Sequence, residues 1–250
     1  MIRCALRAES CDPVSDLPAV LVVVPTYNER DNLPLIVEAV LAREAYRMLV
    51  VDDGSPDGTG ALADSLAAKS NGRLRVLHRT GPRGLGRSYV EGFTRALAEP
   101  VDVVCQMDAD FSHDPAILPV LVETVRDHDL VIGSRYVPGG RVVNWPFHRA
   151  ALSTAANWYI RVALGLRVRD STAGFRCWRR DALARMPLPQ IESDGYAFQI
   201  EMAWEAARRG LRIAEVPISF VERRRGQSKM SWAIVFEALG LPWRLRRRAG

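Results

Sequence analysis

The segment VLVVVPTYNERDNLPLIVEAVL, residues 20–41, decides the fold class. It opens with an uninterrupted run of β-branched and apolar residues at 20–24, which predicts a strand. From residue 32 to residue 41 the apolar side chains recur at helical spacing. A strand followed by an amphipathic helix is a β-α unit, the repeating element of parallel sheets.

The same alternation continues along the chain. Further strands are predicted at residues 48–51, 74–77, 101–107 and 130–132. Further helices are predicted at residues 59–68, 88–97 and 116–125, and a long one ends near residue 164 after a Gly/Pro-rich loop. We therefore expect an α/β fold with a mostly parallel sheet flanked by helices, followed by C-terminal amphipathic helices.

Length and composition favour a single catalytic domain. The 250 residues contain no internal repeat, and nearly half of them are apolar, which suffices for one core. We expect a flexible N-terminal segment at 1–18, a catalytic domain at 19–229 and a basic amphipathic tail at 230–250. Four scattered cysteines form neither a disulfide framework nor a zinc spacing, so a reducing, cytoplasmic setting is expected.

The charge pattern points to anionic partners. The net charge is +5, and Arg clusters occur at 223–225 and 244–248. A general bias toward arginine explains most of the other basic residues on the surface. No nucleic-acid-binding motif accompanies the basic residues. The sequence has neither a signal peptide nor a run of about 18 uncharged apolar residues, so we expect peripheral association with the cytoplasmic face of a membrane.

Three acidic loops follow predicted strands: PTYNE at 25–29, DDGSPDG at 52–58 and DAD at 108–110. Taken singly, each could be turn or capping chemistry. Parallel strands end at one edge of a sheet, however, and carboxylates crowded there repel unless a cation or a donor-rich ligand offsets them. The sequence therefore predicts a binding site at this edge.

Asp108 and Asp110 are the predicted metal ligands. One residue separates them at a strand end, so both side chains point the same way in extended geometry. Such a pair suits Mg²⁺ or Mn²⁺ with a diphosphate completing the coordination. A calcium loop is excluded by His113 and Pro119 at its Gly and Glu positions, and a dinucleotide fingerprint is excluded by Tyr89 at its third Gly position.

The ordered set of motifs resembles the inverting GT-A-fold glycosyltransferases, and within them the polyprenyl (dolichyl) phosphate mannose synthases. The matching segments cover residues 20 to about 231 and are PTYNERDNLPLIV, VVDDGSPDGT, GLGRSYVEGF, MDADFSHDP, GSRY, STAGFR and EVPISFVERRRGQSKMS. The resemblance implies a Rossmann-like domain. It also implies transfer of mannose from GDP-mannose to a polyprenyl phosphate with inversion, giving polyprenyl phosphate mannose and GDP.

The resemblance also implies site residues. It places the nucleoside at Pro25, Tyr27, Glu29, Val51 and Asp53, with Ala109 against the nucleotide. It assigns the metal to Asp108 and Asp110, and the leaving diphosphate to Arg223 and Lys229 on a closing loop, so that Asp110, Arg223 and Lys229 are the expected catalytic residues. Some relatives carry Gln where Ser112 stands, which puts a third side-chain metal ligand in doubt.

Three residues are candidates for the acceptor's phosphate. Arg135, which we also assign to the nucleotide-sugar set, follows the fifth predicted strand. Arg149 and Ser153 lie one helical turn apart, so they can converge on one anion. The alternative is that Arg149 pairs with a surface carboxylate and Ser153 merely packs.

Two helices are candidates for membrane contact. Arg149, Ser153 and Asn157 form a polar stripe on an otherwise apolar helix, which is either packed in the core or interfacial with Trp145 and Trp158 near lipid headgroups. The tail carries an apolar stripe that ends in arginines. The stripe is Trp232, Val235, Phe236, Leu239 and Trp243.

Two rival functions remain. The metal and diphosphate chemistry also fits a UDP-glucose-dependent polyprenyl phosphate glucosyltransferase, which a donor assay would separate. A catalytically silent membrane-docking subunit is the alternative of another class, and the complete acidic set with Lys229 argues against it. A separate membrane-spanning subunit is an expected partner.

Overall fold

A computed structural model of the chain describes residues 18–221 and 232–249, with the backbone alone for 232–239 and 249. Its centre is a seven-stranded sheet with the strand order β3-β2-β1-β4-β7-β5-β8. Every neighbouring pair is parallel except those made by β7, which runs antiparallel to both β4 and β5. The strands of this sheet are β1 (Val20–Thr26), β2 (Tyr46–Asp52), β3 (Leu74–His78), β4 (Val103–Gln106), β5 (Leu130–Ser134), β7 (Arg176–Arg179) and β8 (Ile213–Pro217).

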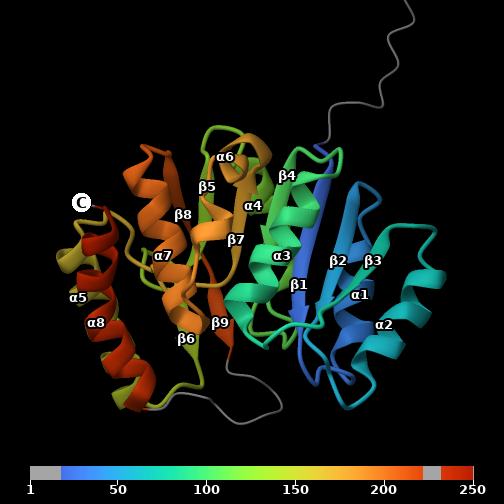
Figure 1. Cartoon of the computed structure of the whole chain (residues 1–250), viewed down its shortest axis with the longest axis horizontal. Helices are drawn as coiled ribbons and strands as arrows, with labels where there is room; N and C mark the ends of the chain where they lie inside the picture. Colours follow the sequence, from blue (N-terminus) through green and yellow to red (C-terminus); the bar gives the residue numbers. More distant parts are fainter. Residues whose placement is uncertain (1–17, 222–231, 250) are drawn as a thin grey trace, which may run out of the picture.

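Helices cover both faces of the sheet (Figure 1). One face is packed by α1 (Leu33–Leu41), α2 (Thr59–Ala68) and α4 (Leu118–Thr124), and the other by α3 (Leu85–Leu97), α6 (Arg180–Ala184) and α7 (Gly195–Arg208). Short 3₁₀ turns lie at Pro115–Ile117 and Leu188–Gln190. The expected fold class, a mostly parallel sheet flanked by helices, is confirmed.

A smaller layer lies at the far end of the sheet from β3. It contains the parallel pair β6 (Arg141–Val143) and β9 (Ser219–Val221), and the helices α5 (Phe147–Leu164) and α8 (Trp232–Ala249). A separate apolar cluster joins α5, α7 and α8, with Ile160, Ile200 and Leu245 at its centre. The two helices therefore dock on the main domain as one unit, side by side in Figure 1.

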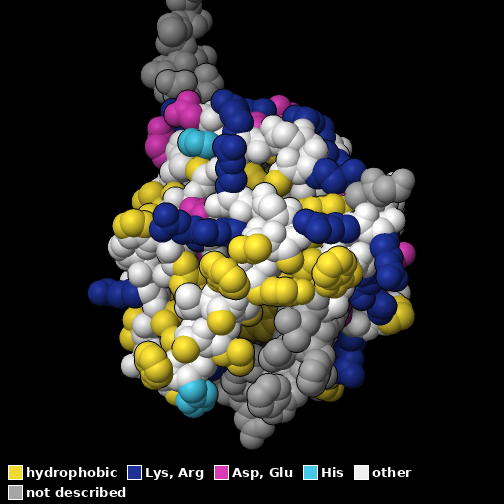
Figure 2. Space-filling view, turned by 90° about the vertical axis from the view of Figure 1, so that its left-hand side faces the viewer, with side chains coloured by type: hydrophobic (Ala, Val, Ile, Leu, Met, Phe, Trp, Pro, Cys, Tyr) yellow, Lys and Arg dark blue, Asp and Glu magenta, His cyan; other side chains and the backbone are white. Residues whose placement is uncertain are grey.

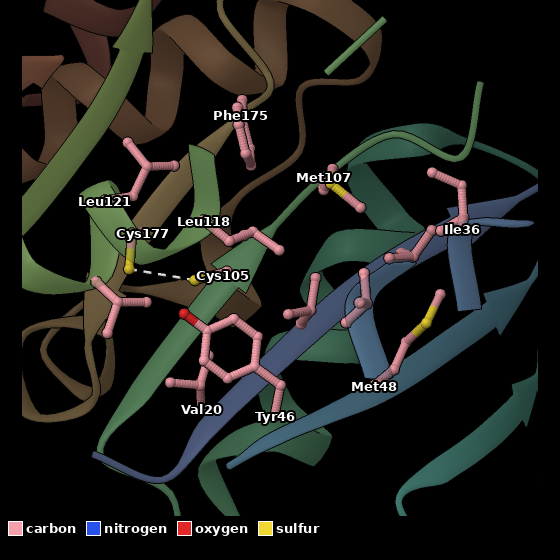
Figure 3. Close-up of a cluster of buried hydrophobic side chains, with 14 of the residues drawn as sticks. Val20, Ile36, Tyr46, Met48, Cys105, Met107, Leu118, Leu121, Phe175 and Cys177 are labelled. Carbon is pink, nitrogen blue, oxygen red and sulfur yellow. Dashed lines mark hydrogen bonds between the residues drawn. The ribbon is translucent and has the colours of Figure 1, made fainter. Parts of the chain in front are cut away.

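The antiparallel strand β7 was not predicted from the sequence. Its four residues begin and end with arginine, so they give no apolar period, yet Cys177 and Trp178 within it are fully buried. Figure 3 shows Cys177 beside Cys105 of β4, with the two sulfur atoms 3.2 Å apart as free thiols. Tertiary packing between two central strands thus imposes the strand conformation on a segment without its own pattern.

The acidic loops meet at one edge of the sheet. Because β1, β2 and β4 are parallel, their carboxyl ends all lie at the lower edge in Figure 1. The strand order reverses between β1 and β4, and ligands of open α/β sheets bind at such a point. The fold therefore brings together the loops that the sequence singled out.

Candidate functional site

A cavity of about 730 Å³ opens at this edge. It is lined by the loops after β1, β2 and β4, the amino ends of α3 and α7, and the first turn of α5. The predicted site residues that line it are Pro25, Tyr27, Glu29, Asp53, Asp108, Ala109, Asp110, Arg135 and Arg149.

The paired aspartates lie at the floor of the cavity. Asp108 keeps 28% of its side chain exposed, and the hydroxyl of Tyr89 donates to its Oδ1 at 3.3 Å. Asp110 is buried, and its Oδ1 accepts both the backbone N–H and the hydroxyl of Ser112, at 3.0 and 2.6 Å. The turn depends on Phe111, whose φ of 60° is in the left-handed region. A non-glycine residue seldom adopts this conformation, and functional loops are where it recurs.

The donor set fits a hard divalent cation. Both candidate ligands are carboxylates, and no group of three or more His, Cys, Asp or Glu side chains that could hold a metal occurs in the described part of the chain. Two carboxylates suffice for Mg²⁺ or Mn²⁺, because these ions take their other ligands from diphosphate oxygens and water. The hydroxyl of Ser112 donates to Asp110, and a role of Ser112 as a third ligand stays untested by this contact.

His113 supports the backbone of Asp108. Its ring is buried between aromatic side chains, stacking on Phe175 at 5.0 Å and meeting Phe220 edge-on. Burial lowers the pKa of His113, and its Nδ1 accepts the N–H of Asp108 at 3.2 Å. A neutral ring with Nδ1 as acceptor carries its proton on Nε2, which fixes the tautomer.

Two carboxylates hold the amino end of α3. Asp53 accepts a hydrogen bond from the N–H of Gly84 at 2.8 Å and forms an ion pair with the buried Arg79. Asp194, at the start of α7, accepts the N–H of Gly86 at 2.6 Å. A Cβ on Gly84 would lie 2.3 Å from a carboxylate oxygen of Asp194, so a larger residue there would displace that carboxylate. The glycines here hold carboxylates of the chain itself, which agrees with the exclusion of a dinucleotide fingerprint.

The nucleoside candidates lie beside this helix end. The guanidinium of Arg83 stacks over the ring of Tyr27 at 4.7 Å and donates to its hydroxyl. Glu29 is held by the first residue of α2, because its N–H donates to the hydroxyl of Thr59 at 3.0 Å. Val51 is fully buried under α3, outside the cavity lining, so its predicted contact with the nucleoside stays a prediction.

Arg135 forms a buried ion pair. Its Nε and Nη2 donate to the two oxygens of Asp170 at 2.7 and 2.6 Å, and Nη2 also donates to Thr172. Burial would lower the pKa of Arg135, but the charge of Asp170 outweighs it and raises the pKa. Arg135 is therefore always charged, and its contact with a bound phosphate stays a prediction.

The structure separates the two α5 candidates. Arg149 lines the cavity, whereas Ser153 does not, and the Ser153 hydroxyl accepts from Tyr136 at 2.7 Å. Asn157, one turn further, is buried and binds the backbone of Ser171. The polar stripe of α5 thus faces the protein. The predicted contact of Ser153 with the acceptor's phosphate stays a prediction. The two residues predicted to bind the leaving diphosphate, Arg223 and Lys229, lie outside the described residues.

Several cavity residues were missed by the sequence reasoning. They are Arg83, Asp194, Gln199 and Phe220. Gln199 ends a chain of side chains in which the indole N–H of Trp178 donates to Gln106 and the amide N–H of Gln106 donates to Gln199. Indole only donates, so the orientation of both amides is fixed. Only Asp194 carried a local signal, because it precedes a helix as a capping residue.

Comparison with known proteins decides the family. Residues 21–188 match the model of glycosyl transferase family 2. The chain belongs to this family. It is therefore a glycosyltransferase with a GT-A-like fold, as the sequence motifs indicated, and the family match includes both aspartates of the cavity floor.

Two curated relatives match over nearly the whole chain. Polyprenol monophosphomannose synthase of Mycolicibacterium smegmatis is 49% identical, over 96% of this chain and 94% of the relative. Undecaprenyl-phosphate mannosyltransferase of Micrococcus luteus is 52% identical, over 88% of this chain and 90% of the relative. The resemblance to polyprenyl phosphate mannose synthases is confirmed at this level of identity.

Solved structures share the fold. Glucosyl-3-phosphoglycerate synthase from Mycobacterium tuberculosis, crystallised with Mn²⁺, UDP and phosphoglyceric acid, superimposes with a TM-score of 0.66 at 19% identity, over 91% of this chain and 78% of that one. A mannosyltransferase from Pyrobaculum calidifontis, in complex with GDP-Man and Mn²⁺, gives 0.63 at 20% identity, over 94% and 66%. At these identities the likeness concerns the fold.

Proposed function

We propose that this glycosyltransferase transfers mannose from GDP-mannose to the phosphate of a polyprenyl phosphate, with inversion at the anomeric carbon. The observation that carries the proposal is that one cavity is lined both by carboxylates and by an arginine. Asp108 and Asp110 lie at its floor, and Arg149 lies on its wall at the start of α5. The names of the two closely similar relatives support the choice of donor sugar and acceptor.

The reaction needs alignment more than proton transfer. A phosphate monoester is anionic at neutral pH, so its oxygen can attack the anomeric carbon without a general base from the protein. The new bond joins the acceptor oxygen to that carbon, while the bond from the carbon to the diphosphate oxygen breaks and GDP leaves. Arg149 would orient the attacking phosphate from the α5 side of the cavity.

Asp108 and Asp110 would hold Mg²⁺ or Mn²⁺ against the donor diphosphate. When bound, the ion supplies positive charge that stabilises the leaving GDP. The proposed role of the chain is to keep both carboxylates in place, through Tyr89 and His113 for Asp108 and through Ser112 for Asp110. We assign Arg223 and Lys229 to the same diphosphate on the strength of the motif in which they stand.

The outer face of α5 supports a membrane role. While Arg149 and Asn157 face the protein, Phe147, Trp158 and Val162 are 87, 62 and 59% exposed. Trp243 of α8 is 63% exposed, and Figure 2 shows apolar side chains gathered with arginines on this side of the molecule. None of the described helices is long and apolar enough to cross a bilayer. We propose that this face rests on the cytoplasmic surface of a membrane that carries the acceptor.

A donor assay tests the proposal. Purified protein is incubated with a polyprenyl phosphate, Mg²⁺ and either GDP-mannose or UDP-glucose, and the glycolipid product is quantified. We expect GDP-mannose to give the larger kcat/KM. A larger value with UDP-glucose would favour the glucosyltransferase, and no product with either donor would favour the docking subunit.

Membrane binding has its own test. We expect the protein to sediment with liposomes that contain anionic lipid, and salt to weaken the binding, because arginines near the face are screened at high ionic strength. Negligible cosedimentation at low salt would contradict the proposed membrane face.

A further inference from the structure

Trp145 lies where the sequence did not place it. We expected it near lipid headgroups together with Trp158, but its side chain lines the cavity and is partly buried. Its indole Nε1 is buried and has no hydrogen-bond partner among the described residues. The two tryptophans therefore stand in different environments, because Trp158 is 62% exposed on the outer face of α5.

The guanidinium of Arg149 lies over the ring face of Trp145. The Cζ atom of Arg149 lies 4.1 Å from the centroid of the Trp145 ring, the shortest such distance among the described residues. Pro146 is the cap residue of α5, with an extended ψ of 143°, so Trp145 stands directly before the helical turn that carries Arg149. The N–H of Arg149 donates to the carbonyl of Pro146 at 3.0 Å and fixes that turn.

The ring of Trp145 has two further contacts. Phe220 of β9 meets it edge-on, with ring centroids 5.6 Å apart and an interplanar angle of 79°. Arg135 lies over the Trp145 ring at 5.7 Å, and Asp170 holds that guanidinium with two hydrogen bonds. Trp145 is thus a packed platform with its orientation set by three elements.

We propose that Trp145 is a positioning residue for the acceptor: its ring holds the Arg149 guanidinium at the cavity wall, ready for the acceptor's phosphate. A ring face attracts a cation through its quadrupole, so the contact at 4.1 Å orients the Arg149 guanidinium. The ring itself carries no formal charge and adds no anion that would compete with phosphate. This inference rests on the proposed function, because that function supplies the anion that Arg149 meets.

The test compares Trp145→Leu and Trp145→Phe with Trp158→Leu as the matched control. Each variant is titrated with farnesyl monophosphate and with GDP by calorimetry, and is assayed for transfer to polyprenyl phosphate. We expect Trp145→Leu to weaken farnesyl phosphate binding and to lower kcat/KM for the acceptor by about 5- to 30-fold, the usual range for a partly buried cation-π contact. Trp145→Phe keeps a ring face, so we expect it within about threefold of the unmodified protein.

GDP affinity is the readout that a general folding defect would change. We expect it to stay within about twofold in every variant, since Arg135, a nucleotide-sugar candidate that lies over the same ring, is held by Asp170 and Thr172 independently of Trp145. Trp158→Leu should leave both titrations, which contain no membrane, unchanged; its transfer rate is not a readout, because Trp158 lies on the proposed membrane face. If Trp145→Leu leaves farnesyl phosphate binding unchanged, or weakens GDP binding equally, the inference is overturned.

A double-mutant cycle decides whether Trp145 acts through Arg149. In an Arg149→Ala background we expect Trp145→Leu to weaken farnesyl phosphate binding no further. If the two substitutions instead weaken binding independently, so that their fold-changes multiply, the inference is overturned. The titration also separates this inference from the proposed function. A protein that binds farnesyl phosphate in a Trp145-dependent way but transfers no mannose refutes the function alone. Normal transfer that is indifferent to Trp145 refutes the inference alone, and no binding of farnesyl phosphate overturns both.

Discussion

The cavity has two walls that hold their charges by different means. On the carboxylate wall, in which we include Asp108 and Asp110 of the floor, Asp53, Asp110 and Asp194 accept hydrogen bonds from backbone N–H groups at Gly84, Ser112 and Gly86. On the arginine wall, Arg135 is held by a buried carboxylate and Arg149 by the face of an indole ring.

The difference lies in which part of the chain does the holding. A backbone amide is fixed by the turn that contains it, and Asp110 and its donor Ser112 are two residues apart. The contact of Arg135 with Asp170 spans 35 residues. Sequence separation does not distinguish the walls, because the contacts of Asp53 with Gly84 and of Asp194 with Gly86 span 31 and 108 residues. What distinguishes them is that main-chain N–H groups hold the carboxylates, whereas side chains hold the arginines. Variants on the two walls should separate these modes.

The largest effect is expected from Asp110→Asn. The substitution keeps the shape and an oxygen acceptor for Ser112 but removes the charge that would bind Mg²⁺. We expect kcat/KM for mannose transfer to fall about 1000-fold, equivalent to about 4 kcal/mol of transition-state stabilisation. The measurement is initial rate against Mg²⁺ concentration.

Asp114→Asn is the matched control for this prediction. Asp114 stands on the same loop, is exposed and caps the following 3₁₀ turn through the N–H of Ala116. We expect its activity to be close to that of the unmodified protein. Full activity of the unmodified protein in excess chelator would refute the metal assignment.

On the arginine wall, Arg149→Ala should act on the acceptor alone. Loss of a charged hydrogen bond costs about 1.5 to 3 kcal/mol, so we expect kcat/KM for polyprenyl phosphate to fall about 10- to 100-fold. GDP affinity, measured by calorimetry, should stay nearly unchanged. Arg161→Ala, in the last turn of the same helix, is the control and should behave normally. Loss of GDP binding in Arg149→Ala would place this arginine on the donor instead.

The residues of the two walls and their contacts could not be predicted equally well from the sequence. On the carboxylate wall, Asp53, Asp108 and Asp110 were predicted, because they follow apolar strands that end at a common edge, whereas Asp194 was missed. The partners on the arginine wall were not, because nothing near Arg135 in the sequence indicates Asp170, and nothing near Trp145 distinguishes a cavity platform from a headgroup anchor. Only the packing of β7, β9 and α5 reveals these contacts.

Asp194→Ala tests whether backbone capping organises the carboxylate wall. The variant leaves the N–H of Gly86 without its acceptor at the start of α3. We expect a loss of about 1 to 2 kcal/mol in the free energy of unfolding, the usual range for a lost cap. Urea denaturation measures it. Asp181→Ala, at the short helix α6, serves as a control on the exposed surface and should cost less. Equal losses in both variants would remove the special role of Asp194.

The smallest effect is expected from Ser112→Ala, and its size discriminates between two roles for this residue. The hydroxyl of Ser112 donates to Asp110 Oδ1 at 2.6 Å, but the backbone N–H of Ser112 donates to the same oxygen at 3.0 Å and survives the substitution. If Ser112 only orients the carboxylate, one of two local bonds is lost, so we expect about 1 kcal/mol, or a roughly fivefold higher half-saturating Mg²⁺ concentration. A direct metal ligand would cost far more, because the ion would lose a bond and not merely a support. Half-saturation measured at constant GDP-mannose decides between them, and a rise beyond about 100-fold would show that the carboxylate wall depends on Ser112 as a third ligand.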